Sequence, residues 1–100
     1  MFETGISVEC KVGKGTFMSE YYVKIECKGD VLWQGVVDKD MVFGFNGTPP
    51  ADKFIDGRLY AYLISFDETE ALIELPVGNS VAGRRITVPR QCVRRERIPA

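Results

Sequence analysis

Apolar and polar residues alternate along most of this chain, and no other feature of the sequence limits its fold as strongly. Every second side chain is apolar over residues 6–12 and again over residues 21–27, which is the pattern of β-strands with one buried face. No stretch of helical length repeats its apolar residues every three or four positions. The sequence therefore predicts an all-β fold.

The length and composition indicate one domain. The chain has 100 residues, of which 45% are hydrophobic, and this suffices for a single core. We expect one all-β domain over residues 1–100, with loose ends at about residues 1–4 and 95–100. Five to six mostly antiparallel strands would close into a small barrel. One long loop is predicted at residues 39–57, where glycines and the Pro49–Pro50 pair interrupt the alternation.

Three hairpins follow from the requirement that paired strands turn their apolar faces to the same side. In the first hairpin, a tip at Lys14–Gly15 pairs Val12 with Phe17. In the other two, tips at residues 28–30 and 68–69 predict these pairs: Cys27 with Val31, Ile25 with Trp33, Val23 with Gly35, Phe66 with Ala71, Ile64 with Ile73, and Tyr62 with Leu75. Trp33 is then expected in the core, beside a glycine that leaves room for its ring.

The last of these hairpins is apolar on both faces, because Leu59, Ala61 and Leu63 lie opposite the side chains that its register turns inward. A strand with two apolar faces is buried on both sides. We expect this hairpin to lie beneath the long loop or in an oligomer interface. The long loop adds candidate binding residues of its own, namely Phe43, Phe45 and Phe54.

Positive charge is concentrated at the C-terminal end, entirely as arginine. Residues 84–100 carry six arginines and one glutamate, whereas residues 1–83 carry seven basic and thirteen acidic residues. These arginines either balance the acidic remainder of the domain or form a surface for phosphates or an acidic partner. The candidate binding residues in this segment are Arg84, Arg85, Arg90, Arg94 and Arg95.

The same segment carries a resemblance to a known family. The residues Ile-Thr-Val-Pro at 86–89 and the returning Val93 form the pattern Val-Pro-x-x-x-Val, which resembles the C-terminal end of SH3-like small barrels. The resemblance implies a single 3₁₀ turn after Pro89 that leads into the last strand, and a three-stranded meander over residues 58–88. The surface by which SH3 domains hold proline-rich peptides is not recognisable in the first half of the chain, so that activity is not expected.

Several kinds of chemistry are excluded. The sequence contains no histidine, which removes the commonest general base near neutral pH and the commonest transition-metal ligand. Cys10, Cys27 and Cys92 are each in phase with an apolar strand face, so we expect three buried, unreactive thiols with neither a disulfide framework nor a zinc site. The acidic clusters lie in predicted turns, where carboxylates are common. We therefore expect no enzyme, no metal site and no cofactor.

These observations favour a non-catalytic binding or assembly module. A homodimer is expected, because the chain has more apolar surface than a small barrel readily hides, and another protein partner would suit the same surfaces. One alternative is a nucleic-acid-binding barrel that uses the C-terminal arginines, although the isoelectric point of about 5.4 opposes it. Another is a small-ligand barrel with a pocket lined by Trp33, Tyr60, Tyr62 and Phe66.

The expected location is the cytoplasm, away from membranes. The N-terminal residues lack the basic head and apolar middle of a secretion signal. No apolar run reaches the roughly 20 residues that a helix needs to cross a bilayer.

Overall fold

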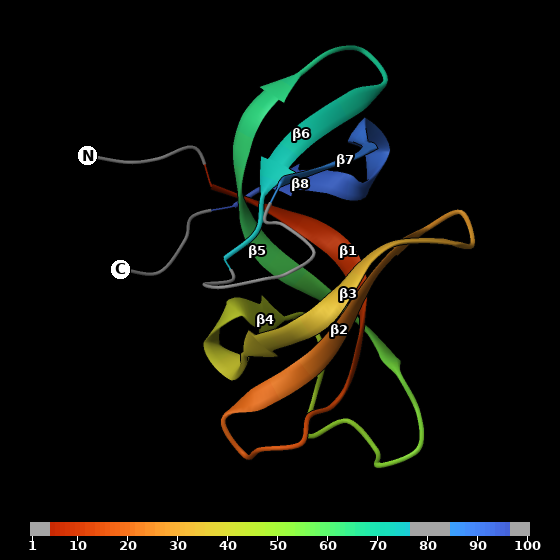
Figure 1. Cartoon of the computed structure of the whole chain (residues 1–100), viewed down its shortest axis with the longest axis vertical. Helices are drawn as coiled ribbons and strands as arrows, with labels where there is room; N and C mark the ends of the chain where they lie inside the picture. Colours follow the sequence, from red (N-terminus) through yellow and green to blue (C-terminus); the bar gives the residue numbers. More distant parts are fainter. Residues whose placement is uncertain (1–4, 77–84, 97–100) are drawn as a thin grey trace.

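The computed structural model describes residues 5–76 and 85–96, which form a nearly closed antiparallel β-barrel (Figure 1). Six strands follow one another in the order β3-β2-β1-β5-β6-β7, and two short strands, β4 and β8, pair with β5 and β1. The strands are β1 (Gly5–Lys14), β2 (Glu20–Cys27), β3 (Asp30–Asp38), β4 (Val42–Phe43), β5 (Ile55–Phe66), β6 (Glu70–Glu74), β7 (Arg85–Pro89) and β8 (Val93–Arg95). The all-β barrel predicted from the alternation is confirmed.

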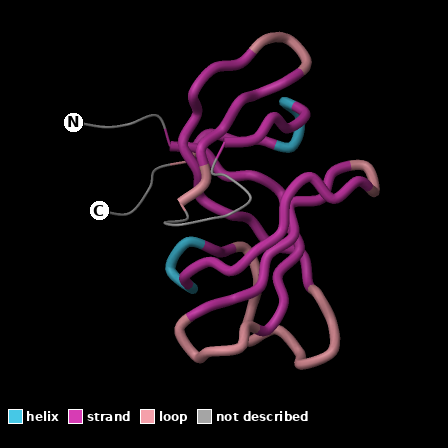
Figure 2. The backbone as a smooth tube through the Cα atoms, in the orientation of Figure 1, coloured by secondary structure: helices cyan, strands magenta, loops and turns pink. Residues whose placement is uncertain are grey.

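Helical structure is confined to two short turns in the described part of the chain (Figure 2). They are the 3₁₀ turns η1 (Lys39–Met41) and η2 (Arg90–Cys92). η2 directly follows Pro89, which ends β7, and it leads without interruption into β8. The turn and the returning strand that were expected after this proline are therefore present.

Two long strands, β1 and β5, run through both halves of the barrel and connect them (Figure 1). They pair with each other along residues 5–12 of β1. The opposite edge of β1 is shared between two strands, since residues 6–8 pair with β8 and residues 11–14 pair with β2. Glu9 and Cys10 lie in the interval between these two ladders. The ends of β2 and η2 are thereby brought to the same part of β1.

The core consists of the inward faces of these strands. Its side chains without any exposed surface include Val8, Val12, Val23, Ile25, Leu59, Ala61, Ile73 and Val88. Burying a side chain of this size stabilises the fold by about 1.5–3 kcal/mol. The alternation identified the inward side chains of β1 and β2 correctly, with one exception near the first turn.

That exception is Phe17, because the first hairpin has a different register from the expected one. Val12 pairs with Val23 instead of Phe17, so the connection is longer than a tip at Lys14–Gly15, and Phe17 lies in it with 68% of its surface exposed. The partner of Val12 has moved by six positions. An even shift keeps the same faces inward, and alternation alone therefore does not distinguish the two registers.

The second hairpin turns at Lys28–Gly29, where both residues have positive φ angles of 53° and 85°, as a type I′ turn requires. A bulge after Ile25 places Cys27 opposite Asp30 instead of Val31. Further from the turn, the predicted pairs are confirmed: Ile25 with Trp33 and Val23 with Gly35.

Trp33 lies in the core as expected, and the glycine beside it is needed there. A Cβ atom at Gly35 would lie 2.7 Å from the Cη2 atom of Trp33, which is closer than two carbon atoms can pack. The indole ring therefore occupies the space that a side chain at position 35 would fill.

The third hairpin keeps the predicted pair of Phe66 with Ala71 but contains a bulge between Leu63 and Ser65. The expected pairs of Ile64 with Ile73 and Tyr62 with Leu75 are therefore wrong. The observed pairs are Leu63 with Ile73 and Tyr62 with Glu74. The extra residue changes which side chains of β5 face inward.

As a result, Leu59 and Ala61, which were expected on the second apolar face of the hairpin, beneath the long loop or in an oligomer interface, lie in the barrel core without exposed surface. Ile64, which was expected to face inward, is 42% exposed.

The long connection between β3 and β5 packs back on the barrel through its three phenylalanines. Each ring contacts a tyrosine: Phe43 stacks on Tyr60 with ring centroids 4.5 Å apart, Phe45 meets Tyr21 edge-on at 5.7 Å, and Phe54 meets Tyr22 edge-on at 6.0 Å. β4 also pairs with β5. This segment therefore packs against both β5 and β2.

The faces of β5 can be tested by a matched pair of substitutions. We expect Leu59→Ala to lower the free energy of unfolding by about 2–5 kcal/mol, because it leaves a cavity in the core. Ile64→Ala on the same strand should cost well under half as much, since Ile64 is 42% exposed. Urea denaturation of both variants checks this, and equal losses would contradict the observed bulge.

Candidate functional site

The first candidate site is an open groove beside the β5–β6 hairpin, bounded by η2 and β8, which we call the hairpin groove. Its volume is about 200 Å³, and it is lined by Ile6, Leu63, Phe66, Ala71, Arg90, Val93 and Arg95. Its floor is apolar and two guanidinium groups flank it. Such a combination suits a partner that offers both an apolar side chain and carboxylates.

An apolar strip on β5 extends this groove. A neighbouring depression is lined by Leu63, Ile64, Ser65, Phe66 and Arg95. Within the strip, Phe66 is 56% exposed and Ile64 is 42% exposed. Large apolar side chains that adjoin one another at the surface typically mark a protein interaction site.

Arg90 holds the tip of this hairpin in place. Its guanidinium lies 4.5 Å from the ring centroid of Phe66, and its Nη1 donates a hydrogen bond to the carbonyl oxygen of Asp67 at 2.9 Å. Within the turn, the Asp67 carboxylate accepts hydrogen bonds from the backbone N–H groups of Thr69 and Glu70, each at 2.8 Å. These bonds lower the pKa of Asp67 below its usual value. Arg90 thus braces an already ordered turn.

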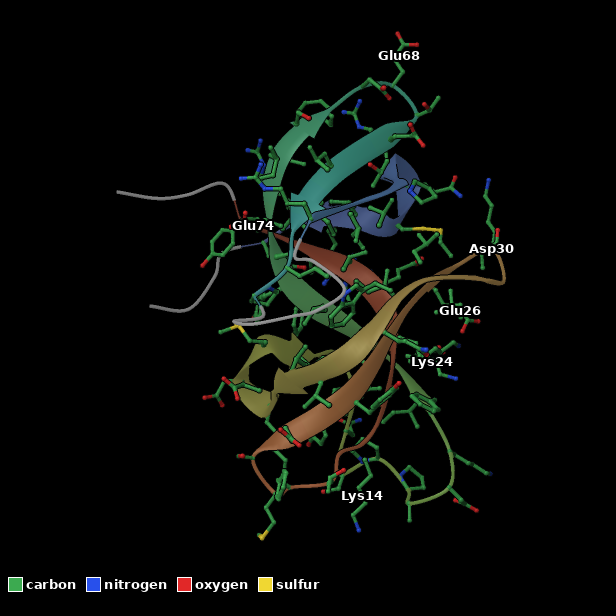
Figure 3. The ribbon with its side chains drawn as sticks, viewed as in Figure 1. Lys14, Lys24, Glu26, Asp30, Glu68 and Glu74 are labelled. Atoms are coloured by element: carbon green, nitrogen blue, oxygen red, sulfur yellow. A yellow bond between two sulfur atoms is a disulfide. The ribbon has the colours of Figure 1, made fainter. Side chains whose placement is uncertain are left out.

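The second candidate site is a polar groove of about 460 Å³, which we call the polar groove. It is lined by Glu9, Cys10, Lys11, Glu26, Gly44, Asp56, Gly57, Arg58 and Arg94. Its charges are mixed, and Lys11 forms an ion pair with Asp56, which raises the pKa of Lys11. Glu26 lies on the side of the molecule where the β2–β3 hairpin projects (Figure 3).

A hydrogen-bond network centred on Arg58 adjoins the polar groove, which Arg58 and Arg94 line. Arg58 Nε donates to the Oγ of Ser7 at 2.7 Å, and its Nη2 donates to the carbonyl oxygens of Ser7 at 3.0 Å and Cys92 at 3.3 Å. The Ser7 hydroxyl, which is fully buried, donates in turn to Glu96 at 2.9 Å. Arg94 Nε donates to the same carboxylate at 2.6 Å. The network joins β5, β1 and β8.

The charges of this network shift the pKa values of its members. Hydrogen bonding to Arg94, assisted by the Ser7 hydroxyl, lowers the pKa of the Glu96 carboxyl, and burial lowers the pKa of the Arg58 guanidinium, helped by the nearby charge of Arg94. Glu96 is therefore ionised when the chain is folded at neutral pH. Arg58 was not identified from the sequence, although it is the one arginine among the seven basic residues of positions 1–83, and arginine suits a half-buried site with several acceptors.

The arginines that were predicted to form one surface lie at separate places on the structure. Arg85 pairs with Glu74 across β6 and β7 at 3.0 Å, Arg90 and Arg95 line the hairpin groove, and Arg94 lines the polar groove. Arg84 lies outside the described residues. The arginines that are adjacent in the sequence therefore do not form one continuous patch, because η2 reverses the chain between β7 and β8.

Arg94 also joins an aromatic pair from the long connection. Its guanidinium lies 6.0 Å from the ring centroid of Phe43, which stacks on Tyr60. Phe45 and Phe54 lie elsewhere, against Tyr21 and Tyr22. The three phenylalanines proposed as one surface are thus in different places, and Phe54 contacts Lys24, whose Nζ lies 4.2 Å from its ring centroid.

The four aromatic residues proposed to line a single pocket are also separated. Trp33 is buried in the core, whereas Phe66 is largely exposed beside the hairpin groove. Tyr60 stacks on Phe43, and Tyr62 lies on the stretch of β5 that pairs with both β1 and β6. These positions give no support to a common ligand pocket.

The cysteines differ from the expectation of three free thiols. Cys27 and Cys92 form a disulfide across 65 residues of sequence, and Cys10 remains free and buried. Burial raises the pKa of the Cys10 thiol to about 12, so it is protonated at neutral pH and a weak nucleophile. All three are buried as predicted. The pairing was not visible in the sequence, because it depends on β2 and η2 reaching the same part of β1.

The Arg58 network can be tested through its buried hydroxyl. Ser7→Ala removes the acceptor of Arg58 Nε and the donor to Glu96, so we expect the free energy of unfolding to fall by about 1–3 kcal/mol. Arg85→Gln, which removes the exposed pair with Glu74, serves as the control and should cost about 0–1 kcal/mol. Urea denaturation compares the two. A loss for Ser7→Ala no larger than that of the control would contradict the role of the network.

Comparison with known proteins adds no relative. No family model matches the chain, and no similar curated protein or solved structure was found. The described residues contain no helix long and apolar enough to cross a membrane. Functional conclusions therefore depend on the two grooves and the residues that form them.

Proposed function

We propose that this chain is a non-catalytic binding module that assembles as a homodimer through the hairpin groove. The observation that carries the proposal is the exposed Phe66 ring, which lies beside an apolar groove of suitable size on the same surface. In a two-fold dimer each copy would insert Phe66 into the groove of the other. An isologous interface needs a surface that is complementary to itself, and a protruding ring next to a groove meets this condition.

Charge supports the same arrangement. The hairpin groove is flanked by Arg90 and Arg95, while the adjoining turn presents the exposed carboxylates of Glu68 and Glu70. Figure 3 shows Glu68 at the outer end of the hairpin, where it points away from the barrel. Opposite charges on one surface can pair across a two-fold axis, and such complementarity sets orientation more than affinity.

A non-catalytic role agrees with the side chains present. The sequence has no histidine, and the free Cys10 thiol is held in its neutral form by burial. The carboxylate of Asp67 is engaged by backbone N–H groups within its own turn. These groups lack the pairing of a base with a nucleophile on which covalent and acid–base catalysis depend.

The dimer is tested by sedimentation velocity of the full chain and two single variants. We expect a dimer for the wild type and at least a tenfold weaker self-association for Phe66→Ser, because buried aromatic anchors dominate such interfaces. Phe17→Ser is the matched control, since Phe17 is equally apolar and 68% exposed but lies in the β1–β2 connection. A monomeric wild type, or a dimer weakened equally by both variants, would refute the proposed interface.

A second candidate function is binding of single-stranded nucleic acid. It is favoured by the stack of Phe43 on Tyr60 with Arg94 above it, because aromatic rings beside arginines are the usual platform for unpaired bases. It is opposed by Glu9, Glu26 and Asp56, which line the adjoining polar groove and would repel phosphates. We therefore rank it below assembly.

This second function is tested by fluorescence anisotropy of a labelled single-stranded oligonucleotide. If the stack binds bases, affinity should fall with added salt, and Tyr60→Ala should lower it by about five-fold or more. Arg85→Gln is the control, since Arg85 pairs with Glu74 and is not a member of the stack. Absence of binding at low salt would exclude this function for the Phe43–Tyr60 surface.

A further inference from the structure

A third cluster of side chains has no part in the proposed dimer. The Sγ atoms of Cys27 and Cys92 and a carboxylate oxygen of Glu9 all lie within 4.8 Å of one another. We propose that these three residues form a binding site for a soft divalent cation of the zinc type when the disulfide between the two cysteines is reduced. The sequence alone predicted no metal site, and the proposal depends on how the strands bring the residues together.

The topology of β1 explains why the three residues meet. Cys27 is the last residue of β2, and Cys92 is the last residue of η2. Both segments approach the edge of β1 that β2 and β8 share, and Glu9 lies in the interval between their ladders. The two sulfur atoms are buried, whereas Glu9 is exposed. The site therefore has an apolar side and a side that is open to solvent.

The donor set selects the kind of ion. Thiolates favour soft cations such as Zn²⁺, Cd²⁺ and Cu⁺ over Mg²⁺ or Ca²⁺. Donor atoms around a tetrahedral zinc ion lie about 3.3–3.8 Å apart. A Glu9 carboxylate oxygen lies within 4.8 Å of both sulfur atoms, and the two sulfur atoms, which are bonded in the disulfide, must move apart to this distance after reduction. Three protein ligands leave a fourth position for water. Glu9 also lines the polar groove, so an ion can reach the carboxylate ligand from solvent.

Metal binding and the disulfide exclude each other. A dithiol reductant supplies two electrons and two protons to the S–S bond, which yields two cysteine thiols and converts the reductant to its own disulfide. Binding of the cation then releases the thiol protons. In either state the end of β2 stays connected to η2, by a covalent bond or by the ion. A reducing compartment, such as the expected cytoplasm, favours the thiol form.

The test uses the full chain reduced with a dithiol, which is then removed under argon, and titration with Cd²⁺ alone. We expect the ultraviolet absorption of sulfur-to-cadmium charge transfer to saturate at one ion per chain, and the oxidised chain to show none. Glu9→Gln keeps both thiols and should weaken binding at least tenfold. Cys27→Ser should remove most of the absorption. Cys10→Ala is the matched control and should bind as the wild type does.

Each of the following results would overturn the proposal. The first is a reduced wild type without charge-transfer absorption, which would make the pair a structural disulfide only. The second is Glu9→Gln binding as tightly as the wild type, and the third is loss of the absorption in Cys10→Ala. Fluorescence of the buried Trp33 reports whether the reduced chain is folded. If reduction unfolds it, Zn²⁺ should restore native emission, and failure to do so would also overturn the proposal.

Discussion

The pairing of β1 with β5 is the constraint on which the rest of this barrel depends. Its register holds Val8 and Leu59 as direct neighbours in the core. A slip by one residue would put the two apolar faces on opposite sides of the sheet, so that only one of these two side chains could stay in the core. Because β5 occupies one edge of β1, both β2 and β8 must use the other edge. The position of the C-terminal segment therefore follows from this single ladder.

The C-terminal strand is held by polar contacts more than by apolar ones. β8 is short and two of its three residues are exposed, so it buries little surface. The Ser7 hydroxyl of β1 and the Arg58 guanidinium of β5 form hydrogen bonds with each other and with Glu96 and Cys92, the residues that flank β8. Bonds to charged groups contribute about 1.5–3 kcal/mol each. The barrel is thus closed in part by a partly buried network whose members depend on one another.

The sequence predicted which residues form strands and which faces of β1 and β2 are buried. It did not predict the register of the first hairpin or the bulges. The alternation correctly indicated the inward faces of β1 and β2, because the side-chain period of a strand is independent of its partner. The alternation did not predict the register of the first hairpin, because an even shift of register leaves the same side chains facing inward. It also failed near Ile64, because one extra residue in a bulge changes which side chains of β5 face inward. The Val-Pro ending correctly predicted a turn and a returning strand.

The candidate sites were predicted less well, since they depend on which strands become neighbours. Arginines that are close in the sequence lie at three separate places on the structure. Arg58, which has no arginine near it in the sequence, is the centre of a hydrogen-bond network. The burial of Cys27 and Cys92 was predicted because each lies on the apolar face of its segment. Their disulfide could not be predicted, because it depends on β1 bringing the two segments together. Phe66 was expected to face inward. It keeps its predicted partner Ala71, but it is the last residue of β5 before the turn, and 56% of its surface is exposed.

The contact between Arg90 and Phe66 bears on the entropy of association. An arginine side chain that is free in solution loses about 2 kcal/mol of rotamer freedom when an interface fixes it. Here the guanidinium is already held by the Asp67 carbonyl and the Phe66 ring in the isolated chain. The Arg90 side chain therefore loses most of its conformational entropy when the chain folds, and little more when a partner binds. A partner that covers Phe66 would then bind more tightly than it would to a chain whose Arg90 was disordered, because less entropy is lost on association.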